Sequence, residues 1–322
     1  MRFNTLDAWL DWQQKLHPKH IELGLERVQR VFQRLPLETI APRVITIAGT
    51  NGKGSTVAYY ESWFRHHGIR VASYTSPHIV RYNERIRLNA EPVSDRQLCE
   101  AFEAVDQARC DTSLTYFEFG TLAAFYLISR YAPEVALLEV GLGGRLDAVN
   151  IIDPDLAHIT PIGLDHQDWL GPDRESIALE KAGILRRRGM AVINDNEPAQ
   201  SLLDELQRLD CDYLLSSRDY RYRWLDARFI EWQNNQHKLL LQPPLVGEHQ
   251  VHNLSGVLAG LGRLGYLDDQ PDDVSTAFAD ASCAGRLQRI DSVLQAAGYG
   301  EVSDHNDAAG LSRVSLGRRP AQ

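Results

Sequence analysis

Apolar and polar positions alternate in a regular way along the first two thirds of the chain. Short apolar, often β-branched runs indicate buried strands, and the stretches between them carry apolar residues at three- and four-residue spacing, which is typical of amphipathic helices. We predict strands at 44–47, 71–74, 135–138, 156–160 and 190–194. Helices are expected at 6–16, 22–35, 56–67, 119–131, 175–185 and 198–209, with one more that is capped by Ser94 and runs to 109. Strands that alternate with helices predict an α/β fold with a mostly parallel sheet flanked by helices.

The pattern changes after residue 212. Runs at 220–225, 228–232 and 238–241 alternate in polarity and predict a small antiparallel element. Arginine and aromatic residues mixed within 220–232 could also suit a nucleic-acid surface, but alternating strand faces explain them more simply. Helices follow at 249–264 and 272–281, and periodicity fades after residue 290. We therefore expect a main domain over 1–290 and an irregular tail over 291–322.

A glycine-rich turn joins the first strand to the next helix and predicts a phosphate-binding loop. A strand, a glycine loop and a helix N-terminus together present backbone N–H groups and a favourable helix dipole to an anion. Lys53 would reach the β- and γ-phosphates of a nucleotide, and Ser55 or Thr56 would place a hydroxyl on Mg²⁺. Gly54 separates Lys53 from Ser55, so the loop is a variant of the common pattern. The candidate nucleotide contacts are Gly49, Thr50, Asn51, Gly52, Lys53, Gly54 and Ser55.

Three further side chains are candidates for chemistry. Glu139 follows an apolar strand, where a carboxylate can bind Mg²⁺ directly or through water, although a solvated glutamate is the alternative. His166 follows another strand and could meet Glu139 and the loop, because the ends of parallel strands share one rim; a structural histidine is the alternative. Lys181 is expected on a helix, usually a solvated position. If it were buried beside metal, its amine would lose charge readily and could take up CO₂ as a carbamate.

Composition narrows the range of partners. The 322 residues are 43% hydrophobic and 24% charged, as in an ordinary globular protein of about two domains. The net charge of −9 argues against broad binding to nucleic acid or to an anionic membrane. Four widely spaced cysteines indicate free thiols in a reducing compartment, and neither a signal peptide nor a run of 18 apolar residues is visible. We expect a cytoplasmic protein.

Several longer motifs together resemble the folylpolyglutamate synthase / dihydrofolate synthase family of Mur-ligase-like ATP-dependent amide ligases. The resemblance covers about residues 6 to 290. The motifs are GTNGKGS at 49–55, TSPHIVRYNER at 75–85, LTYFEFG at 114–120, LEVGLGGRLDAVN at 138–150, LDHQDWLGPDRESIALEKAGI at 164–184, AGRL at 284–287 and, for the family's opening helix, IELGLERV at 21–28.

The resemblance implies a P-loop-like Mur ligase central domain, ATP and Mg²⁺ as cofactors, and a monomer. It implies that Ser55, Glu139 and His166 hold Mg²⁺, that Lys53 grips the ATP phosphates, and that Lys181 is carbamylated. Lys53, Lys181 and His166 are the candidate catalytic residues. Asn253 and Arg286 are expected to contact ATP. A pterin would lie between two segments that contribute Ser76, Pro77, His78, Arg81, Glu84, Arg85, Phe117 and Glu118.

The implied reaction joins L-glutamate to dihydropteroate, to the glutamate tail of a reduced folate, or to both. ATP would phosphorylate the acceptor carboxylate, and the amine of glutamate would attack the resulting acyl phosphate. Positioning and charge stabilisation dominate such a phosphoryl transfer, so no protein nucleophile is required. Arg81, Arg85 or Arg87 could steer an acidic folate tail despite the negative net charge.

The chain departs from the family after Arg286, where a C-terminal α/β domain that begins with Asp-x-Ala-His-Asn-Pro is expected. Only Ser303 to Asp307 echo that motif, and Ala284 replaces a proline. We therefore expect a truncated or frameshifted chain in which the C-terminal ligase domain is missing. The alternatives to an active ligase are a non-catalytic nucleotide- or pterin-binding remnant, and another Mur-type ligase that uses a nucleotide sugar.

Overall fold

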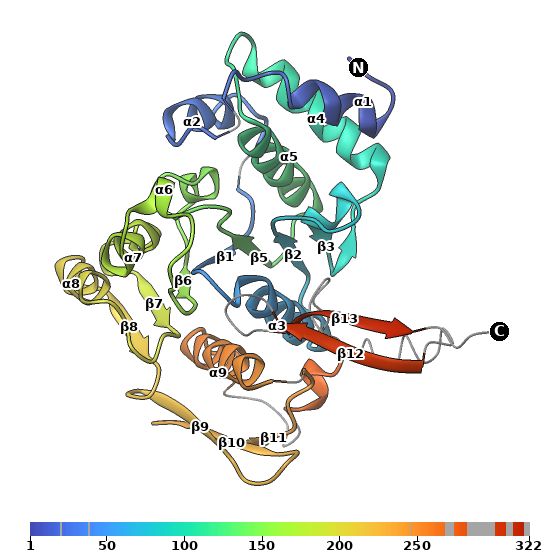
Figure 1. Ribbon diagram of the computed structural model, residues 1–322. Coiled ribbons are helices and arrows are strands. Elements are labelled where there is room, and N and C mark those ends of the chain that lie inside the picture. Colours follow the sequence, from blue (N-terminus) through green and yellow to red (C-terminus); the bar gives the residue numbers. More distant parts are fainter. Residues whose placement is uncertain are drawn as a thin grey trace.

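The computed structural model describes residues 1–19, 21–37, 39–245, 247–267 and 274–281, together with the backbone of 300–306 and 312–318. An eight-stranded sheet runs through the middle of the molecule (Figure 1). Its strands are β1 (Arg43–Ala48), β2 (Val71–Tyr74), β3 (Ile86–Leu88), β4 (Glu91–Pro92), β5 (Val135–Glu139), β6 (Leu156–Ile159), β7 (Met190–Ile193) and β8 (Asp212–Leu215). The order is β4-β3-β2-β5-β1-β6-β7-β8, in which β3 and β4 form an antiparallel edge and the other six strands are parallel. The predicted mostly parallel α/β fold is confirmed.

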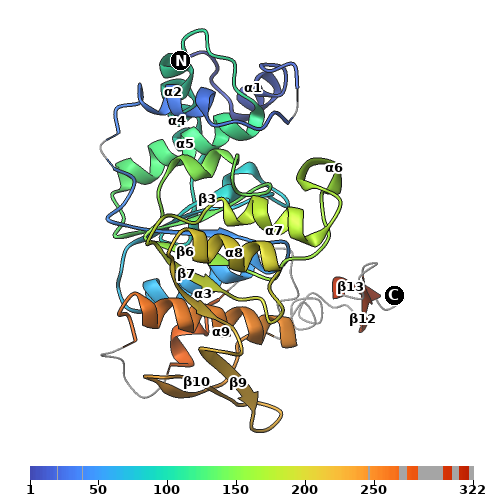
Figure 2. The same cartoon turned by 90° about the vertical axis from the view of Figure 1, so that its left-hand side faces the viewer.

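Helices cover both faces of the sheet (Figure 2). On one side of the sheet lie α5 (Tyr116–Tyr131), α7 (Arg174–Ala182) and α8 (Gln200–Arg208), and α1 (Leu6–Gln13), α2 (Glu26–Phe32) and α4 (Asp95–Arg109) pack around α5. The other face packs against α3 (Lys53–His66) and α9 (Glu248–Arg263). In β5, Ala136 and Leu138 face α5, whereas Val135 and Leu137 belong to the core with α3 and α9. Successive side chains of a strand point to opposite faces, so a strand buried on both faces is apolar throughout. Crossing a bilayer would need a longer and more apolar helix than any within the described ranges.

A second, three-stranded antiparallel sheet packs against α9. It consists of β9 (Tyr220–Trp224), β10 (Ile230–Asn234) and β11 (Lys238–Leu241), in the order β11-β10-β9. Tyr220, Ile230 and Trp232 are fully or almost fully buried and join the core beneath α3 and α9. The indole Nε1 of Trp232 donates to the carbonyl oxygen of Ser255 in α9 at 3.1 Å. The predicted antiparallel element is therefore confirmed, and it supports α9 from below.

Some predicted boundaries were wrong. The helix expected at 22–35 begins only at Glu26, because 21–25 forms a loop in which Gly24 has φ 153°. Helix α5 begins three residues early, because Thr115 caps it and Glu118 completes the capping box. Of the helix expected at 272–281, the described part contains the short 3₁₀ turn η3 (Thr276–Phe278). The tail is not wholly irregular, since β12 (Gly300–Asn306) pairs antiparallel with β13 (Ser312–Arg318).

A buried ion pair fastens the antiparallel edge of the main sheet to α3. Glu61 of α3 is 2% exposed, and its Oε2 lies 3.1 Å from Nη1 of Arg87 in β3. Ser73 donates its hydroxyl to the other carboxylate oxygen at 2.6 Å. Burial raises the pKa of Glu61, and the positive charge of Arg87 opposes that rise. Arg87 is thus engaged in a structural pair, which argues against the expectation that it steers an acidic tail.

We predict that Arg87→Met destabilises the protein by about 3–5 kcal/mol, because it leaves the Glu61 carboxylate buried without its cation. Urea unfolding followed by circular dichroism measures the change. Arg81→Met is the matched control: Arg81 also pairs with a carboxylate, Asp95 at 3.0 Å, but its side chain is 66% exposed. The control should cost about 1 kcal/mol or less. Equal losses for the two variants would contradict a special role for the buried pair.

Candidate active site

The glycine-rich loop forms the turn between β1 and α3, as the sequence predicts. Gly52 caps the N-terminus of α3 with φ 92°, and Gly49 has φ 147°, so both adopt backbone conformations that favour glycine. A Cβ on Gly49 would collide with Thr160, and a Cβ on Gly52 would collide with the side chain of Asn253. The loop is therefore packed closely between the end of β6 and helix α9, with the N-terminus of α3 available to an anion.

Two lysine side chains meet at one backbone carbonyl of this loop. Lys53 donates its Nζ to the carbonyl oxygen of Gly49 at 3.0 Å and to that of Thr50 at 3.3 Å. Lys181 of α7, 5% exposed, donates its Nζ to the same Gly49 oxygen at 2.9 Å. Burial and, to a smaller extent, the nearby charge of Lys53 together lower the pKa of Lys181 to about 8. Lys181 therefore does not lie on the solvated helix face that is usual for a lysine.

The helix that carries Lys181 is fixed by contacts with the loop that follows β5. The backbone N–H of Arg145 donates to the carbonyl oxygen of Glu180 at 2.8 Å. Asn150 donates its Nδ2 to the carbonyl oxygens of Arg145 at 3.1 Å and Gly183 at 2.9 Å. These bonds hold the segment 145–150 against the C-terminal end of α7, although Arg145 and Glu180 are 35 residues apart in the sequence. They thereby fix the position of Lys181 beside the phosphate loop.

Glu139 and His166 lie at the same rim of the sheet as the loop. Strand β1 pairs in parallel with β5, so that Glu139 is opposite Ile47, and with β6, so that Ile159 is opposite Ala48. Glu139 is 4% exposed and accepts the backbone N–H of Ser76 at 3.1 Å. His166 caps the short helix α6 (Gln167–Leu170) with φ 52°, and its side chain is 57% exposed. The parallel strand order thus brings the predicted candidates together.

The donor set fits Mg²⁺ or Mn²⁺ in a nucleotide site. Glu139 offers a buried carboxylate, Ser55 a buried hydroxyl at the first turn of α3, and His166 an imidazole. Among side chains that the structure describes, no three histidine, cysteine, aspartate or glutamate groups gather into a metal cluster. A divalent ion here would therefore take further oxygens from phosphate and water, which is the usual arrangement for Mg²⁺.

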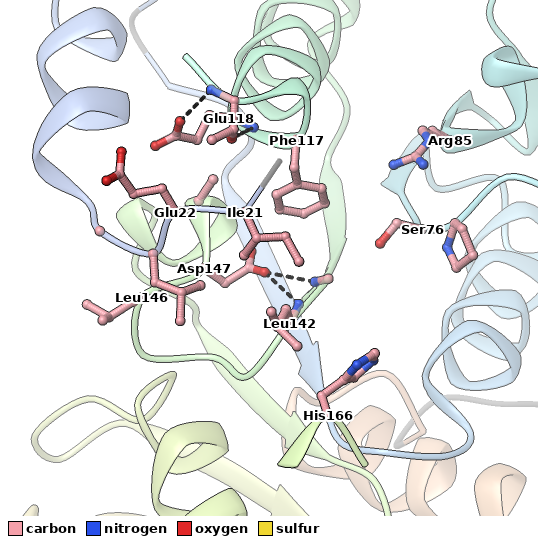
Figure 3. Close-up of a pocket in the computed structure, with 16 residues that line it drawn as sticks. Ile21, Glu22, Ser76, Arg85, Phe117, Glu118, Leu142, Leu146, Asp147 and His166 are labelled. Carbon is pink, nitrogen blue, oxygen red and sulfur yellow. Dashed lines mark hydrogen bonds between the residues drawn. The ribbon is translucent and has the colours of Figure 1, made fainter. Parts of the chain in front are cut away.

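Next to this rim lies a cavity of about 300 Å³ (Figure 3). Apolar side chains from four segments of the chain line it, and in the view of Figure 3 Phe117, Ile21 and Leu142 lie on one side, with Ser76 and Arg85 on the other. Ser76, whose backbone N–H donates to Glu139, and the metal candidate His166 both line this cavity. The full lining is Ile21, Glu22, Leu23, Gly24, Ser76, Pro77, Arg85, Thr115, Phe117, Glu118, Gly141, Leu142, Leu146, Asp147, Ala148 and His166.

A buried carboxylate that sequence reasoning did not select lies in this cavity. Asp147 is 3% exposed, and its Oδ2 accepts the backbone N–H groups of Gly141 at 3.0 Å and Leu142 at 2.9 Å. Its Oδ1 accepts the N–H of Val149 at 2.9 Å. Burial raises the pKa of Asp147 to about 6, although these three hydrogen bonds and the charge of Lys53 oppose the rise. The sequence feature that could have pointed to Asp147 is that it is the one acidic residue within the apolar and glycine-rich run 140–150.

The predicted acceptor-binding residues divide into two groups. Ser76, Pro77, Arg85, Phe117 and Glu118 line the cavity. His78, Arg81 and Glu84 do not line it but support the loop: His78 accepts Nε–H of Arg85 at 2.8 Å, Arg81 pairs with Asp95, and Glu84 accepts the N–H groups of residues 79–81. The carboxylate of Glu118 accepts the N–H of Thr115 and pairs with Arg27, so it serves the helix cap.

Of the two side chains expected to contact ATP outside the loop, Asn253 is described. It is 3% exposed on α9 and lies against Gly52 of the loop. Arg286 lies outside the described residues.

The loop and the paired lysines lie beside an apolar cavity, and the sequence pattern of the Mur ligase middle domain matches residues 47–261, which places the chain among the ATP-dependent ligases of the Mur type. The chain is 41% identical over 294 residues to the dihydrofolate synthase/folylpolyglutamate synthase of Escherichia coli, covering 89% of this chain and 67% of that protein. The chain belongs to the dihydrofolate synthase/folylpolyglutamate synthase family. The family and fold class that the motifs predict are confirmed.

Solved structures agree with this assignment. E. coli FolC in complex with DHPP and ADP superposes with a TM-score of 0.83 at 40% identity, over 88% of this chain and 68% of that one. A bifunctional folylpolyglutamate synthase/dihydrofolate synthase with Mn, AMPPNP and L-glutamate bound has a TM-score of 0.79 at 40% identity, with the same coverage. This chain spans about two thirds of the length of these relatives.

We predict that the ammonium group of Lys181 titrates near pH 8, well below the ordinary lysine value of 10.5. The protein contains only five lysines, so ¹³C NMR of lysine-labelled protein resolves them, and the Lys181→Arg spectrum assigns the signal. Lys53→Met should raise the Lys181 pKa, because it removes a neighbouring positive charge, but not to 10.5, because burial is the larger cause. A wild-type midpoint above pH 10 would contradict this account.

Proposed function

We propose that this chain binds ATP with Mg²⁺ at the loop 49–55 and joins L-glutamate to dihydropteroate, to a reduced folate, or to both. The observation that carries the proposal is the continuity of the two sites. Ser76 lines the cavity and donates its backbone N–H to Glu139 at the metal rim, and His166 lines the same cavity. An acceptor in the cavity would therefore reach the phosphate loop with its far end.

The cavity suits a flat heteroaromatic ring such as a pterin. Phe117, Ile21 and Leu142 provide apolar walls, and Asp147 provides a carboxylate that can accept N–H groups of the ring. A few polar groups within a mainly apolar pocket typically fix the orientation of a ligand. The solved structure of one relative contains DHPP and that of another contains L-glutamate, which supports the same classes of substrate for this chain.

Arg85 would bind the anionic end of the acceptor. Its guanidinium group lies 5.3 Å from the ring centroid of Tyr82 and 5.9 Å from that of Tyr116, which fixes its position at the cavity wall. Of the three arginines expected to steer an acidic tail, Arg85 is the one that lines the cavity. Arg81 is paired with Asp95 at the surface and Arg87 with Glu61 inside.

In the proposed reaction the acceptor carboxylate attacks the γ-phosphorus of ATP, which gives an acyl phosphate and ADP. The amine of glutamate then attacks the acyl carbon, forms the amide bond and releases phosphate. Lys53 and the N-terminus of α3 would neutralise charge on the transferring phosphoryl group, and Ser55, Glu139 and His166 would hold the ion. Bound Mg²⁺ would supply charge neutralisation between two anions. The lowered pKa of Lys181 also favours the carbamate that the family resemblance implies, because more of its amine is neutral.

ADP release tests the proposed activity. We expect ADP formation from ATP and Mg²⁺ that requires both glutamate and either dihydropteroate or tetrahydrofolate, with the amide product identified by mass spectrometry. ATP binding without acceptor-dependent turnover would instead favour a non-catalytic nucleotide- or pterin-binding protein. Turnover with a UDP-linked muropeptide would favour another Mur-type ligase.

We predict that Asp147→Asn raises the KM for the acceptor by at least about tenfold and changes the KM for ATP less than about twofold. An amide cannot accept the three backbone N–H groups that hold the cavity wall, and a buried donor left unsatisfied costs about 1–3 kcal/mol. Steady-state kinetics measure both constants. Asp226→Asn is the matched control, because Asp226 also accepts two backbone N–H groups but lies in the exposed β9–β10 turn. An unchanged acceptor KM for Asp147→Asn would contradict the proposal that the acceptor binds in the cavity lined by Asp147.

A further inference from the structure

Asn194, the residue that follows β7, connects the sheet to helix α9 through two hydrogen bonds. Its Nδ2 donates to the carbonyl oxygen of His252 at 2.9 Å, and the ring Nε2 of His252 lies 2.7 Å from the carbonyl oxygen of Asn194. Because a carbonyl oxygen only accepts, His252 must carry a hydrogen on Nε2. Asn194 is fully buried and His252 is 9% exposed. The two residues thus bind each other reciprocally in the interior.

A third side chain fixes the orientation of the Asn194 amide. The hydroxyl of Tyr220, from the small antiparallel sheet, donates to Oδ1 of Asn194 at 2.9 Å. The amide oxygen is therefore turned toward Tyr220 and the amide nitrogen toward His252. Gly256, one turn further along α9, packs directly on the Asn194 side chain. These contacts fix how the first turns of α9 are rotated about the helix axis and where they lie along that axis relative to the sheet.

The position of α9 decides where Asn253 lies. Asn253 is next to His252 in the sequence, and its side chain packs against Gly52 at the N-terminus of α3. The close fit leaves no room for a Cβ at Gly52, so a small shift of α9 would open or block this contact. The path from the end of β7 to the phosphate loop therefore runs through Asn194, His252 and Asn253.

We propose that Asn194 is a positioning residue for the nucleotide, acting through His252 to hold Asn253 against the phosphate loop. This inference rests on the proposed function, because it assumes that the loop binds ATP. The hydrogen bonds of the Asn194 side chain go to His252 and Tyr220, and neither partner belongs to the loop 49–55. Because Tyr220 of the small antiparallel sheet orients the Asn194 amide, this sheet also contributes to nucleotide binding in the proposal.

The test uses Asn194→Asp, which keeps the size of the side chain. The new carboxylate oxygen faces the His252 carbonyl oxygen, so a buried hydrogen bond is replaced by a contact between two acceptors. We expect the Kd for ATP with Mg²⁺, measured by calorimetry on the full chain, to rise about tenfold. The Kd for dihydropteroate should change less than about twofold. Equal weakening for the two ligands would mean a general loss of structure and would overturn the proposal.

A double-mutant cycle separates positioning from general support. In an Asn253→Ala background, Asn194→Asp should weaken ATP binding less than about twofold, because the side chain through which it acts is gone. If Asn194→Asp instead weakens ATP binding by the same factor with and without the Asn253 side chain, the proposal is overturned. Tyr222→Phe is the matched control: it removes a hydroxyl that donates from the same small sheet to Glu248 of α9 but leaves Asn194 in place. An equal loss for this control would also count against Asn194.

A second pair of variants applies if Asn194→Asp does not fold. His252→Gln can place an amide nitrogen where the ring Nε2 lies and should keep ATP binding, whereas His252→Phe cannot donate and should lose about tenfold. Equal Kd values for this pair would overturn the inference while leaving the proposed function intact. Wild-type protein that does not bind ATP would overturn both.

Discussion

The site depends on the carbonyl oxygen of Gly49, which accepts hydrogen bonds from two lysine ammonium groups. Lys53 reaches it from the first turn of α3, and Lys181 reaches it from α7. Burial and, after it, the repulsion between these two like charges lower the pKa of Lys181. An anion at the loop would relieve the repulsion. Lys53 and the N-terminus of α3 therefore already lie where the proposed triphosphate would need them.

The rest of the fold holds this arrangement in place from two directions. The loop after β5 forms a wall of the acceptor cavity through Asp147 and also fixes the helix that carries Lys181, through Asn150. On the other face of the sheet, α9 brings Asn253 against Gly52. The acceptor cavity and the phosphate loop thus share backbone segments. A ligase that must bring two anions together benefits from such a common frame, because the cost of orientation is met in folding and not at each turnover.

Much of this site could be predicted from the sequence because parallel strands impose a simple rule. Each strand ends at the same rim, so Glu139, His166 and the glycine loop were expected together, and the register of β1 with its two neighbours supports that expectation. Asp147 and Asn194 were not predicted, since their partners are defined by loop geometry and by contacts about 60 residues away. The engagement of Arg87 by Glu61 was missed for the same reason. Periodicity reveals which face of an element is buried, but not which polar groups meet there.

The central claim is that the phosphate loop and Glu139 bind one nucleotide and its metal at the sheet rim. Crystals of the protein grown with Mn²⁺ and a non-hydrolysable ATP analogue test this claim most directly, because manganese gives an anomalous signal. We predict an anomalous peak bonded to Ser55 and Glu139, with the triphosphate on the N-terminus of α3. A manganese peak that touches neither side chain, or a nucleotide bound away from Lys53, would contradict the account.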